Sequence, residues 1–547
     1  MAVAAQGWDE DADVVVVGSG AAGLTAALTA AAGGARVVIL EKSAMLGGTT
    51  AMSGAGIWIP ANHHMLAAGM SDSKDEALTY IRAVAPEGWQ AVEDALWRAF
   101  VDHAPETLEF IERHTPLAFE LVHHPDLYSE APGGKYNGRM VSTLPISRNL
   151  LGRWRDRIRP STVPHLFTYD ELRLGTLMER PVWSIFKLGP RLIWRFLTRR
   201  VAMGNGLVTG LLKGCLDRGC HIVAEARARR LIESEDRIAG IEVELADGTR
   251  RIRARRGVVL ATGGFEWNAA LRERYFPGET CLIGAPDTNT GDGHAMAEAV
   301  GARLERMDQA NIYPSTIATY EGRRHAQPLY DMTQPHSILV NRDARRFVSE
   351  GEPNVGVALD ARDPASGQPI HMPAWRIFDA RFAANNSLAM RIARSEKGWL
   401  RKADDLATLA RMTGLDAGQL GATVARFNCF VRQGKDDDFR RGETAWERFY
   451  SGDMEGSGVN SALGTIEEPP FYAMPFPRAL LVTKGGPRTN ERGQVLRADG
   501  SRIAGLYCAG VAMANPIGSK AVGAGTTLGP CLTWGRICGL NLLRENV

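Results

Sequence analysis

Three glycines near the N-terminus have the GxGxxG spacing of a site that binds the diphosphate of a dinucleotide. Gly18, Gly20 and Gly23 come directly after the apolar run 14–17 and before an alanine-rich, helix-favouring stretch at 24–32. The first glycine permits a tight turn, the second lets the backbone approach the diphosphate, and the third lets helix and strand pack closely. The free N–H groups and the dipole at the start of the helix then favour a negative charge. We therefore predict a dinucleotide site in the first sixty residues.

An acidic residue ends the apolar strand that follows this helix. Glu41 closes the run 36–40 and lies 18 residues after Gly23. A carboxylate at this place accepts hydrogen bonds from ribose hydroxyls and repels a 2′-phosphate. The pattern therefore favours FAD or NAD over NADP.

Later glycine-rich segments favour FAD over NAD. The stretches 47–50 (GGTT) and 53–56 (SGAG) follow Lys42 closely, and they supply backbone N–H groups and hydroxyls where an extended dinucleotide would continue. Apolar strands that end in glycine recur at 258–264 and 506–510. A cofactor that is contacted by such distant segments fits FAD better than a nicotinamide dinucleotide.

The order of strands and helices predicts an α/β fold, with a Rossmann-like FAD-binding domain and an inserted α+β substrate or catalytic domain. The pattern changes near residue 310, and the nucleotide-binding pattern returns at 493–510. We predict an FAD-binding domain over residues 1–310, an inserted domain over 311–464 and a return to the first domain over 465–547.

A helical and loop-rich excursion over residues 60–204 interrupts the first domain. Residues 74–114 are expected to be helical, and residues 182–200 mix aromatic and aliphatic residues with Lys187 and with arginines. Such a segment lies in a membrane interface, covers a substrate entrance or packs on the protein with its arginine stems extended. The sequence leaves these three alternatives open.

The composition excludes several classes of protein. Lys and Arg number 64 against 62 Asp and Glu, which gives no electrostatic footprint for nucleic acid. The seven cysteines include no CxxC pair, so we predict no metal site and expect reduced, buried thiols. The chain shows neither a secretory signal nor an apolar run long enough to cross a membrane. Together these features predict a cytoplasmic protein.

Spaced motifs along nearly the whole chain resemble the 3-ketosteroid Δ1-dehydrogenase group of the fumarate reductase/succinate dehydrogenase flavoprotein superfamily. They are DVVVVGSGAAGL from 13, VVLATGG from 258, NTGDGHAMAEAVGA from 289, LVNRDARRFVSE from 339, and GLYCAG and GAGTTLG near the end. The resemblance implies removal or addition of two hydrogens across a C–C bond next to the carbonyl of an apolar cyclic ketone. The flavin takes a hydride from the β-carbon, a base takes the α-proton, and a donor stabilises the enolate oxygen. An external electron acceptor is also implied, and the sequence does not identify it.

The resemblance further implies a non-covalent FAD, because Thr50 stands where covalently linked members have a histidine near this loop. His63 and His64 lie further along and are the alternative attachment points. The residues expected to contact the cofactor are Gly18, Gly20, Ala21, Ala22, Gly23, Glu41, Lys42, Gly47, Gly48, Thr49, Thr50, Ser53, Gly54, Ala55, Gly56, Ala226, Ala261, Gly263, Asp292, Gly510, Asn515, Gly525 and Leu528.

The chain departs from this group at its three tyrosines. Leu127, Asn354 and Ala521 occupy those positions, and Leu and Ala can neither donate a hydrogen bond nor move a proton. A shift of one residue in the alignment would bring Tyr128 to the first position. Gly525 keeps the glycine whose backbone N–H holds the ketone oxygen in this group, although a close approach to the flavin explains it equally well.

Three side chains are candidates for the missing acid and base. Lys520 precedes Ala521, and a lysine beside a flavin would have its pKa lowered by desolvation. Tyr128 and Tyr313 are phenols that could remove an α-proton if their pKa were lowered. Each also has a structural explanation, an ion pair for the lysine and packing for the tyrosines.

Two further functions remain possible at this point. A fumarate-reductase-like enzyme that reduces an unsaturated acid would need an arginine to deliver a proton, and Arg346 and Arg488 are the candidates, although the motif around Arg488 resembles a structural turn and strand. A flavoprotein that binds FAD without turnover would explain the missing tyrosines.

Overall fold

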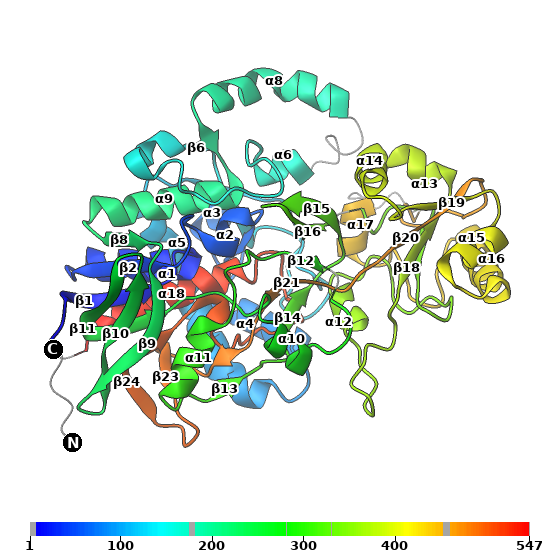
Figure 1. Cartoon of the computed structure of the whole chain (residues 1–547). Helices are drawn as coiled ribbons and strands as arrows, with labels where there is room; N and C mark the ends of the chain where they lie inside the picture. The colour runs from blue at the N-terminus through cyan, green and yellow to red at the C-terminus, as the bar shows by residue number, and fades with distance from the viewer. Residues whose placement is uncertain (1–6, 174–180, 281, 330, 452–459, 546–547) are drawn as a thin grey trace.

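A mostly parallel sheet built from segments spread over the whole chain lies at one end of the molecule, near both termini (Figure 1). The computed structural model describes residues 7–173, 181–280, 282–329, 331–451 and 460–545. The parallel strands, in sheet order, are β8 (His221–Ala224), β2 (Val37–Glu41), β1 (Glu10–Val17), β11 (Gly248–Leu260) and β24 (Arg502–Cys508). Antiparallel neighbours extend it, namely β9 (Arg227–Ser234), β10 (Arg237–Leu245) and β23 (Gln494–Leu496).

The inner strands of this sheet end in buried apolar runs because helices cover both faces there. Val14, Val15 and Val16 of β1 are all 0% exposed. Val14 pairs with Val37 on one side and with Gly257 on the other. The strands predicted at 14–17 and 36–40, and the one predicted to precede the glycines of 258–264, are confirmed, although β1 and β11 both begin earlier than expected.

Small residues let two helices pack closely beside the sheet. These helices are α1 (Ala21–Ala32) and α18 (Leu528–Leu542). A Cβ on Gly535 of α18 would lie 2.4 Å from the carbonyl oxygen of Ala22, and one on Gly539 would lie 2.8 Å from that of Ala26. The glycines of α18 therefore bring it against the first turns of α1, where the predicted dinucleotide site begins.

The predicted excursion contains several helices and short strands. Its helices are α2 (Gly48–Met52), α3 (His63–Ala67), α4 (Lys74–Val84), α5 (Gln90–His114), η1 (Arg148–Trp154), α6 (Tyr169–Arg173), α8 (Pro181–Leu197) and α9 (Met203–Asp217). Its strands are β3 (Ile57–Trp58), β4 (Phe119–Leu121), β5 (Met140–Thr143), β6 (Ile146–Ser147) and β7 (Arg200–Val201). The expectation of one helical stretch over 74–114 is corrected, because Gly88 adopts a φ of +78° between α4 and α5.

A second sheet lies at the other end of the molecule (Figure 1). Its order is β17 (Ser337–Val340), β18 (Trp375–Phe378), β20 (Phe471–Pro475) and β19 (Arg401–Ala403). The sheet includes β20, which lies beyond residue 464, so we propose that the inserted domain extends to about residue 476. The helices of this part are α12 (Val355–Leu359), α13 (Ala380–Asn385), α14 (Ser387–Ser395), α15 (Leu406–Thr413), α16 (Ala417–Gln433) and α17 (Ala445–Ser451).

Short strands and helices connect the two sheets. The strands are β12 (Leu282–Ile283), β13 (Leu304–Glu305), β14 (Ala310–Ile312), β15 (Ser315–Tyr320), β16 (Arg323–Pro328), β21 (Ala479–Thr483) and β22 (Gly486–Pro487). The remaining helices are α10 (Ala269–Tyr275), α11 (Asp292–Ala299) and η2 (Gly510–Ala512). The chain therefore has an α/β fold with a Rossmann-like sheet and a second, inserted α+β part.

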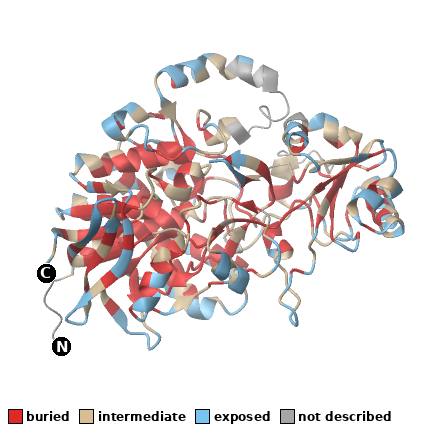
Figure 2. Cartoon of the chain, in the orientation of Figure 1, coloured by how far each residue is buried: buried red, intermediate tan, exposed pale blue. Residues whose placement is uncertain are grey.

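Burial is concentrated around the sheet that contains β1 and β11, whereas α8 stands at the edge of the molecule (Figure 2). Among the described helices, none combines the length and the apolar character that crossing a bilayer requires. Free thiols lie buried at Cys215, Cys220, Cys508, Cys531 and Cys538. The expectation of buried thiols is wrong for Cys429, which is exposed, and Cys281 lies outside the described residues.

Candidate functional site

A groove of about 790 Å³ opens over the N-terminus of α1. Gly18 adopts a φ of +109°, and a Cβ there would lie 2.2 Å from the carbonyl oxygen of Ala261. A Cβ on Gly23 would lie 2.0 Å from the carbonyl oxygen of Gly18. By contrast, a Cβ on Gly20 would meet only Thr50 Oγ1, at 3.6 Å. The first and third glycines are thus fixed by packing, and the second keeps space free beside the helix.

The start of α1 leaves backbone donors available for a ligand, apart from Ala21 N, which donates to Thr50 Oγ1. Gly20, the residue before the helix, provides no side-chain cap, and the first turn carries no acidic residue. Unpaired N–H groups at a helix start attract an anion. This end of the groove therefore suits a diphosphate.

A carboxylate stands beside the diphosphate position. Glu41, at the end of β2, is buried and accepts hydrogen bonds from Ser19 Oγ at 2.6 Å and from Ser43 N at 2.9 Å. Ser19 Oγ in turn accepts from Gly47 N at 2.9 Å. These contacts orient the carboxylate at the groove, where it can accept hydrogen bonds from ribose hydroxyls.

Polar side chains line the groove on the side of α2 and α11. Thr50 Oγ1 accepts from Ala21 N at 3.0 Å, and Asn289 Nδ2 donates to Thr49 Oγ1 at 3.2 Å. Lys42 Nζ lies 3.0 Å from Asp292 Oδ2. Burial raises the pKa of Asp292, but a hydrogen bond from Thr290 and the charge of Lys42 outweigh it, and the pKa falls below its ordinary value. Asp292 therefore stays ionised.

The structure brings many of the predicted cofactor residues to this one groove. Those that line it are Gly18, Gly20, Ala21, Ala22, Glu41, Lys42, Gly48, Thr49, Thr50, Ala226, Ala261, Gly263, Asp292 and Gly510. Those that do not line it are Gly23, Gly47, Ser53, Gly54, Ala55, Gly56, Asn515, Gly525 and Leu528. Asn515 Oδ1, for example, accepts from Ile517 N at 2.8 Å and so shapes its own loop.

The groove has further lining residues that the sequence analysis did not single out. They are Val17, Ser19, Leu40, Ala228, Thr262, Thr288, Asn289, Met296, Val511 and Cys531. Ser19 lies inside the glycine fingerprint and Asn289 begins the NTGDG motif, so both had a signal in the sequence. The backbone N–H groups at one end of the groove, and a lining that comes from distant segments of the chain, fit an extended dinucleotide.

The three positions that lack the tyrosines of the resembled group lie together. Asn354 Nδ2 donates to the carbonyl oxygen of Ala521 at 2.9 Å, and Ala521 N donates to Asn354 Oδ1 at 2.9 Å. Leu127 N donates to the carbonyl oxygen of Val522, next to Ala521, at 3.3 Å. Segments more than 150 residues apart in the sequence therefore meet at one place.

A phenol from a neighbouring position occupies this place. The Tyr128 hydroxyl donates to Glu352 Oε1 at 2.8 Å and accepts from Asn354 Nδ2 at 2.9 Å. Burial, and then the charge of Glu352, raise the pKa of Tyr128 well above its ordinary value. The expectation of a lowered phenol pKa is therefore wrong for Tyr128, which is a neutral hydroxyl at physiological pH. Glu352 is a member of the site that the sequence analysis missed.

The two other candidates differ in their relation to this cluster. Lys520 Nζ lies 5.1 Å from the centre of the Tyr128 ring, a cation–π contact. Tyr313 follows β14, and its ring packs on the apolar cluster around Val355 and Phe378. Lys520 thus contacts the ring of Tyr128, whereas Tyr313 packs in the apolar cluster around Val355 and Phe378.

Gly525 lies four residues after Ala521 and touches the segment before β3. Its φ is +95°, and a Cβ would lie 2.4 Å from the carbonyl oxygen of Gly56. Its own carbonyl oxygen accepts from Trp58 N at 3.3 Å. None of the hydrogen bonds between described residues uses the N–H of Gly525, so this N–H is available to a ligand. Position 525 therefore requires glycine because the backbone of Gly56 packs against it.

The arginines suggested for an unsaturated acid are occupied. Arg346 is buried and pairs with Glu350 and Asp436, both at 2.8 Å. Arg488 pairs with Glu93 at 2.7 Å. Both arginines are held in ion pairs inside the protein, so neither is a free cation for a substrate carboxylate.

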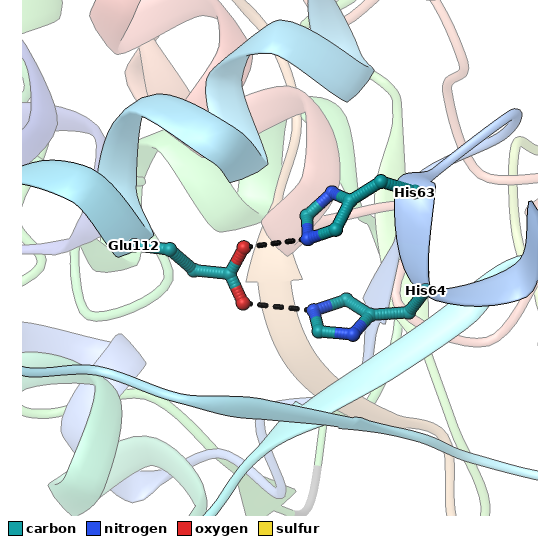
Figure 3. Close-up of side chains that lie close together, drawn as sticks. All are labelled: His63, His64 and Glu112. Carbon is teal, nitrogen blue, oxygen red and sulfur yellow. Dashed lines mark hydrogen bonds and ion pairs between the residues drawn. The ribbon is translucent and has the colours of Figure 1, made fainter. Parts of the chain in front are cut away.

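The two histidines considered for a covalent link lie elsewhere. His63 and His64, on α3, both pair with Glu112 of α5, and none of the three lines the groove (Figure 3). This arrangement supports a cofactor held by non-covalent contacts.

The chain is similar to known flavoproteins along its full length. A family model described as FAD binding domain matches residues 13–528. The 3-oxosteroid 1-dehydrogenase of Mycolicibacterium smegmatis is 38% identical over 97% of this chain and 97% of its own. The 4-oxocyclohexanecarboxylate 2-dehydrogenase of Sinomonas cyclohexanicum is 37% identical over 96% of this chain and 92% of its own. The solved 3-ketosteroid Δ1-dehydrogenase of Sterolibacterium denitrificans, in complex with 1,4-androstadiene-3,17-dione, has a TM-score of 0.88 at 34% identity, covering 98% of this chain and 100% of that chain.

Proposed function

This chain belongs to the FAD binding domain family and, within it, to the group of the 3-oxosteroid 1-dehydrogenases, and we propose that it desaturates a C–C bond next to the ketone of a 3-ketosteroid or another cyclic ketone. The reverse reduction of an enone uses the same site. The observation that carries the proposal is that Tyr128, Glu352 and Asn354 meet Ala521, which lies on the loop that leads to Gly525. This loop connects η2, which contains Gly510, to α18, which contains Cys531, and both of these residues line the groove for FAD.

The cofactor, when bound, accepts a hydride from the β-carbon of the substrate. The chain supplies the groups that handle the carbonyl and the proton. The free N–H of Gly525 binds the ketone oxygen and makes the α-proton more acidic. The phenol oxygen of Tyr128 takes that proton while its own proton passes to Glu352, 2.8 Å away. Since Tyr128 is neutral before and after the step, its raised pKa suits this relay.

Neighbouring groups hold the relay in place. Asn354 donates to the Tyr128 oxygen and pairs with the backbone of Ala521, which fixes the phenol against the Gly525 loop. The Tyr80 hydroxyl accepts from Tyr128 N at 3.1 Å and donates to the carbonyl oxygen of Val522 at 2.6 Å. The lost tyrosines are thus replaced by one phenol from an adjacent position and by a carboxylate. The buried free thiols support our assignment of the enzyme to the cytoplasm.

Reduction of the bound flavin by a substrate tests the function. Anaerobic mixing of the FAD-loaded enzyme with 3-ketosteroids or with substituted cyclohexanones is expected to bleach the oxidised flavin band. The corresponding alcohols, which lack the acidifying carbonyl, are the matched controls and should leave the band unchanged. Bleaching by no cyclic ketone, together with oxidation of the reduced enzyme by fumarate, would assign the chain to the unsaturated-acid alternative.

A second proposal concerns α8, which presents an apolar face to the outside. Phe186, Ile193 and Leu197 are 86%, 62% and 73% exposed and share one face of the helix with the exposed Pro190. The opposite face holds Arg195, which is buried and donates to Glu171 and to the carbonyl oxygen of Leu166. The helix is therefore fastened through its arginine and carries its apolar residues outward, the reverse of a packed amphipathic helix.

We propose that this face lies in a membrane interface and receives the apolar substrate there. Trp194 and Phe196, 52% and 70% exposed, flank the stripe, and residues 181–197 contain no acidic side chain. The exposed Arg191 adds positive charge that suits anionic lipid headgroups, whereas the exposed Arg199 pairs with Asp156 at 3.3 Å. An apolar stripe with aromatic residues beside it and a basic residue on the same helix favours a lipid surface over a second copy of this chain.

Replacing Ile193 and Leu197 by Glu together is expected to abolish sedimentation of the enzyme with phosphatidylglycerol vesicles, while turnover of a dispersed ketone persists. The matched control carries Val92→Glu and Met412→Glu, two exposed apolar positions on α5 and α15, and should sediment like the parent. Equal sedimentation of all three proteins would refute the proposal. Concentration-dependent dimers that only the α8 variant loses would assign the stripe to self-association instead.

A further inference from the structure

A compact group of metal-binding side chains lies apart from the FAD groove. His63 Nε2 lies 2.7 Å from Glu112 Oε2, and His64 Nε2 lies 2.8 Å from Glu112 Oε1. The ligand atoms of all three residues lie within 4.8 Å of one another. Figure 3 shows that both imidazole rings, which come from α3, face the carboxylate of Glu112. We infer that His63, His64 and Glu112 form a binding site for a divalent transition metal ion such as Zn²⁺.

The donor set points to this class of ion. Two imidazole nitrogens and one carboxylate oxygen are the protein ligands of open zinc sites, in which water takes the remaining position. Imidazole suits Zn²⁺, Cu²⁺ and Ni²⁺, whereas Mg²⁺ and Ca²⁺ prefer oxygen ligands. The site therefore selects against the two common alkaline-earth ions.

The distances allow an ion to enter with a small adjustment. Zinc bonds of about 2.0–2.2 Å in tetrahedral geometry separate neighbouring ligand atoms by about 3.3 Å. The N···O distances of 2.7 and 2.8 Å must therefore lengthen by roughly half an ångström, which a small rotation of the carboxylate provides. In the metal-free form His64 Nε2–H donates to the carboxylate and His63 Nε2 lies 2.7 Å from it, so metal binding displaces both contacts and requires deprotonated Nε2 atoms.

The ligands are held by rigid elements and can be reached from solvent. Asn62, which is fully buried, accepts from Met65 N at 2.9 Å and donates to the carbonyl oxygens of Ile59 and Gly138. This fixes the start of α3, and Glu112 belongs to the long helix α5. The side chains of His63, His64 and Glu112 are 37%, 26% and 21% exposed, so an ion can enter without opening the fold.

Titration of Zn²⁺ into untagged, FAD-loaded enzyme is expected to show one ion bound per chain. Glu112→Gln and His64→Asn should each weaken binding by about tenfold or more, with bound flavin unchanged. Co²⁺ as a spectroscopic probe should show the visible bands of a low-symmetry nitrogen–oxygen site, and both variants should lose them. Binding should also weaken at acid pH, because protonated imidazole cannot ligate.

The matched control is His221→Asn, since His221 also pairs with a carboxylate, Glu10, at 3.1 Å, but without a third metal-binding side chain among the described residues. This variant should bind Zn²⁺ like the parent. The assignment is overturned if the parent binds no ion, or if Glu112→Gln and His64→Asn bind it as tightly as the parent. The result is independent of the ketone activity, because the measurement needs no turnover.

Discussion

Tyr128→Phe is expected to lower kcat for ketone desaturation by about 10²–10⁴-fold while FAD stays bound. The substitution removes the one phenol that the structure places between Glu352 and Asn354. Phenylalanine keeps the ring that packs under Lys520 Nζ, so the local fold should persist. Stopped-flow reduction of the flavin by the substrate measures the chemical step directly, and the flavin spectrum checks that the cofactor is retained.

Glu352→Gln tests the relay from its other end. Gln keeps a hydrogen bond to the Tyr128 hydroxyl but cannot take up its proton, so removal of the α-proton should slow. With substrate deuterated at the α-carbon, the isotope effect on flavin reduction should become larger in this variant than in the parent. A purely structural role for Glu352 would leave the isotope effect unchanged.

Tyr313→Phe is the matched control for the tyrosine experiment. Its ring packs on the inserted core, so the loss of its hydroxyl should change the rate much less than the loss of the Tyr128 hydroxyl. A large loss in Tyr313→Phe, with Tyr128→Phe near the parent rate, would move the base to Tyr313 and refute the relay.

The sequence predicted the nucleotide part well because its determinants are local. The turn at Gly18, the helix after Gly20 and the carboxylate of Glu41 follow one another within a single β-α-β unit. Backbone sterics and hydrophobic burial set these elements over short stretches of chain. The same reasoning located the apolar ends of the strands around Val14 and Val258, whereas β1 and β11 begin well before them, at Glu10 and Gly248.

The proton-handling cluster could not be predicted to the same depth. Tyr128 meets Glu352 across 224 positions of sequence, and only the packing of the two parts brings them to 2.8 Å. The direction of the Tyr128 pKa also depends on burial and on that carboxylate, neither of which a motif reveals. An alignment marks Leu127 as a lost tyrosine, but it cannot show that the next residue turns its hydroxyl into the same place.

Charge partners were equally invisible in the sequence. Arg346 and Arg488 stand in motifs that suggested a substrate cation, yet each is held by carboxylates from distant segments. The outward face of α8 is a similar case, because periodicity shows that a helix has an apolar side but not which way that side points. Sequence patterns give the elements, and tertiary contacts decide their roles.

Gly20→Val is expected to weaken FAD binding by about 5- to 150-fold without unfolding the apoprotein. A Cβ at Gly20 meets only Thr50 Oγ1, at 3.6 Å, so the folded chain accepts it. The added methyl groups would occupy the space where the diphosphate approaches the start of α1, and overpacking of this kind costs about 1–3 kcal/mol. Titration of FAD into the apoprotein, followed by quenching of flavin fluorescence, measures the affinity, and circular dichroism measures the fold.

Two neighbouring substitutions separate the loss of the ligand from the loss of the fold. Gly20→Ala adds only the carbon that the structure accommodates and should lower the affinity less than Val does. Gly23→Ala should prevent folding, because its Cβ would lie 2.0 Å from the carbonyl oxygen of Gly18 between β1 and α1. A Gly20→Val protein that binds FAD as tightly as the parent would show that the diphosphate does not lie over the start of α1. A graded loss from Ala to Val in folded protein would instead place it there, because only a ligand in that space can sense the size of the side chain.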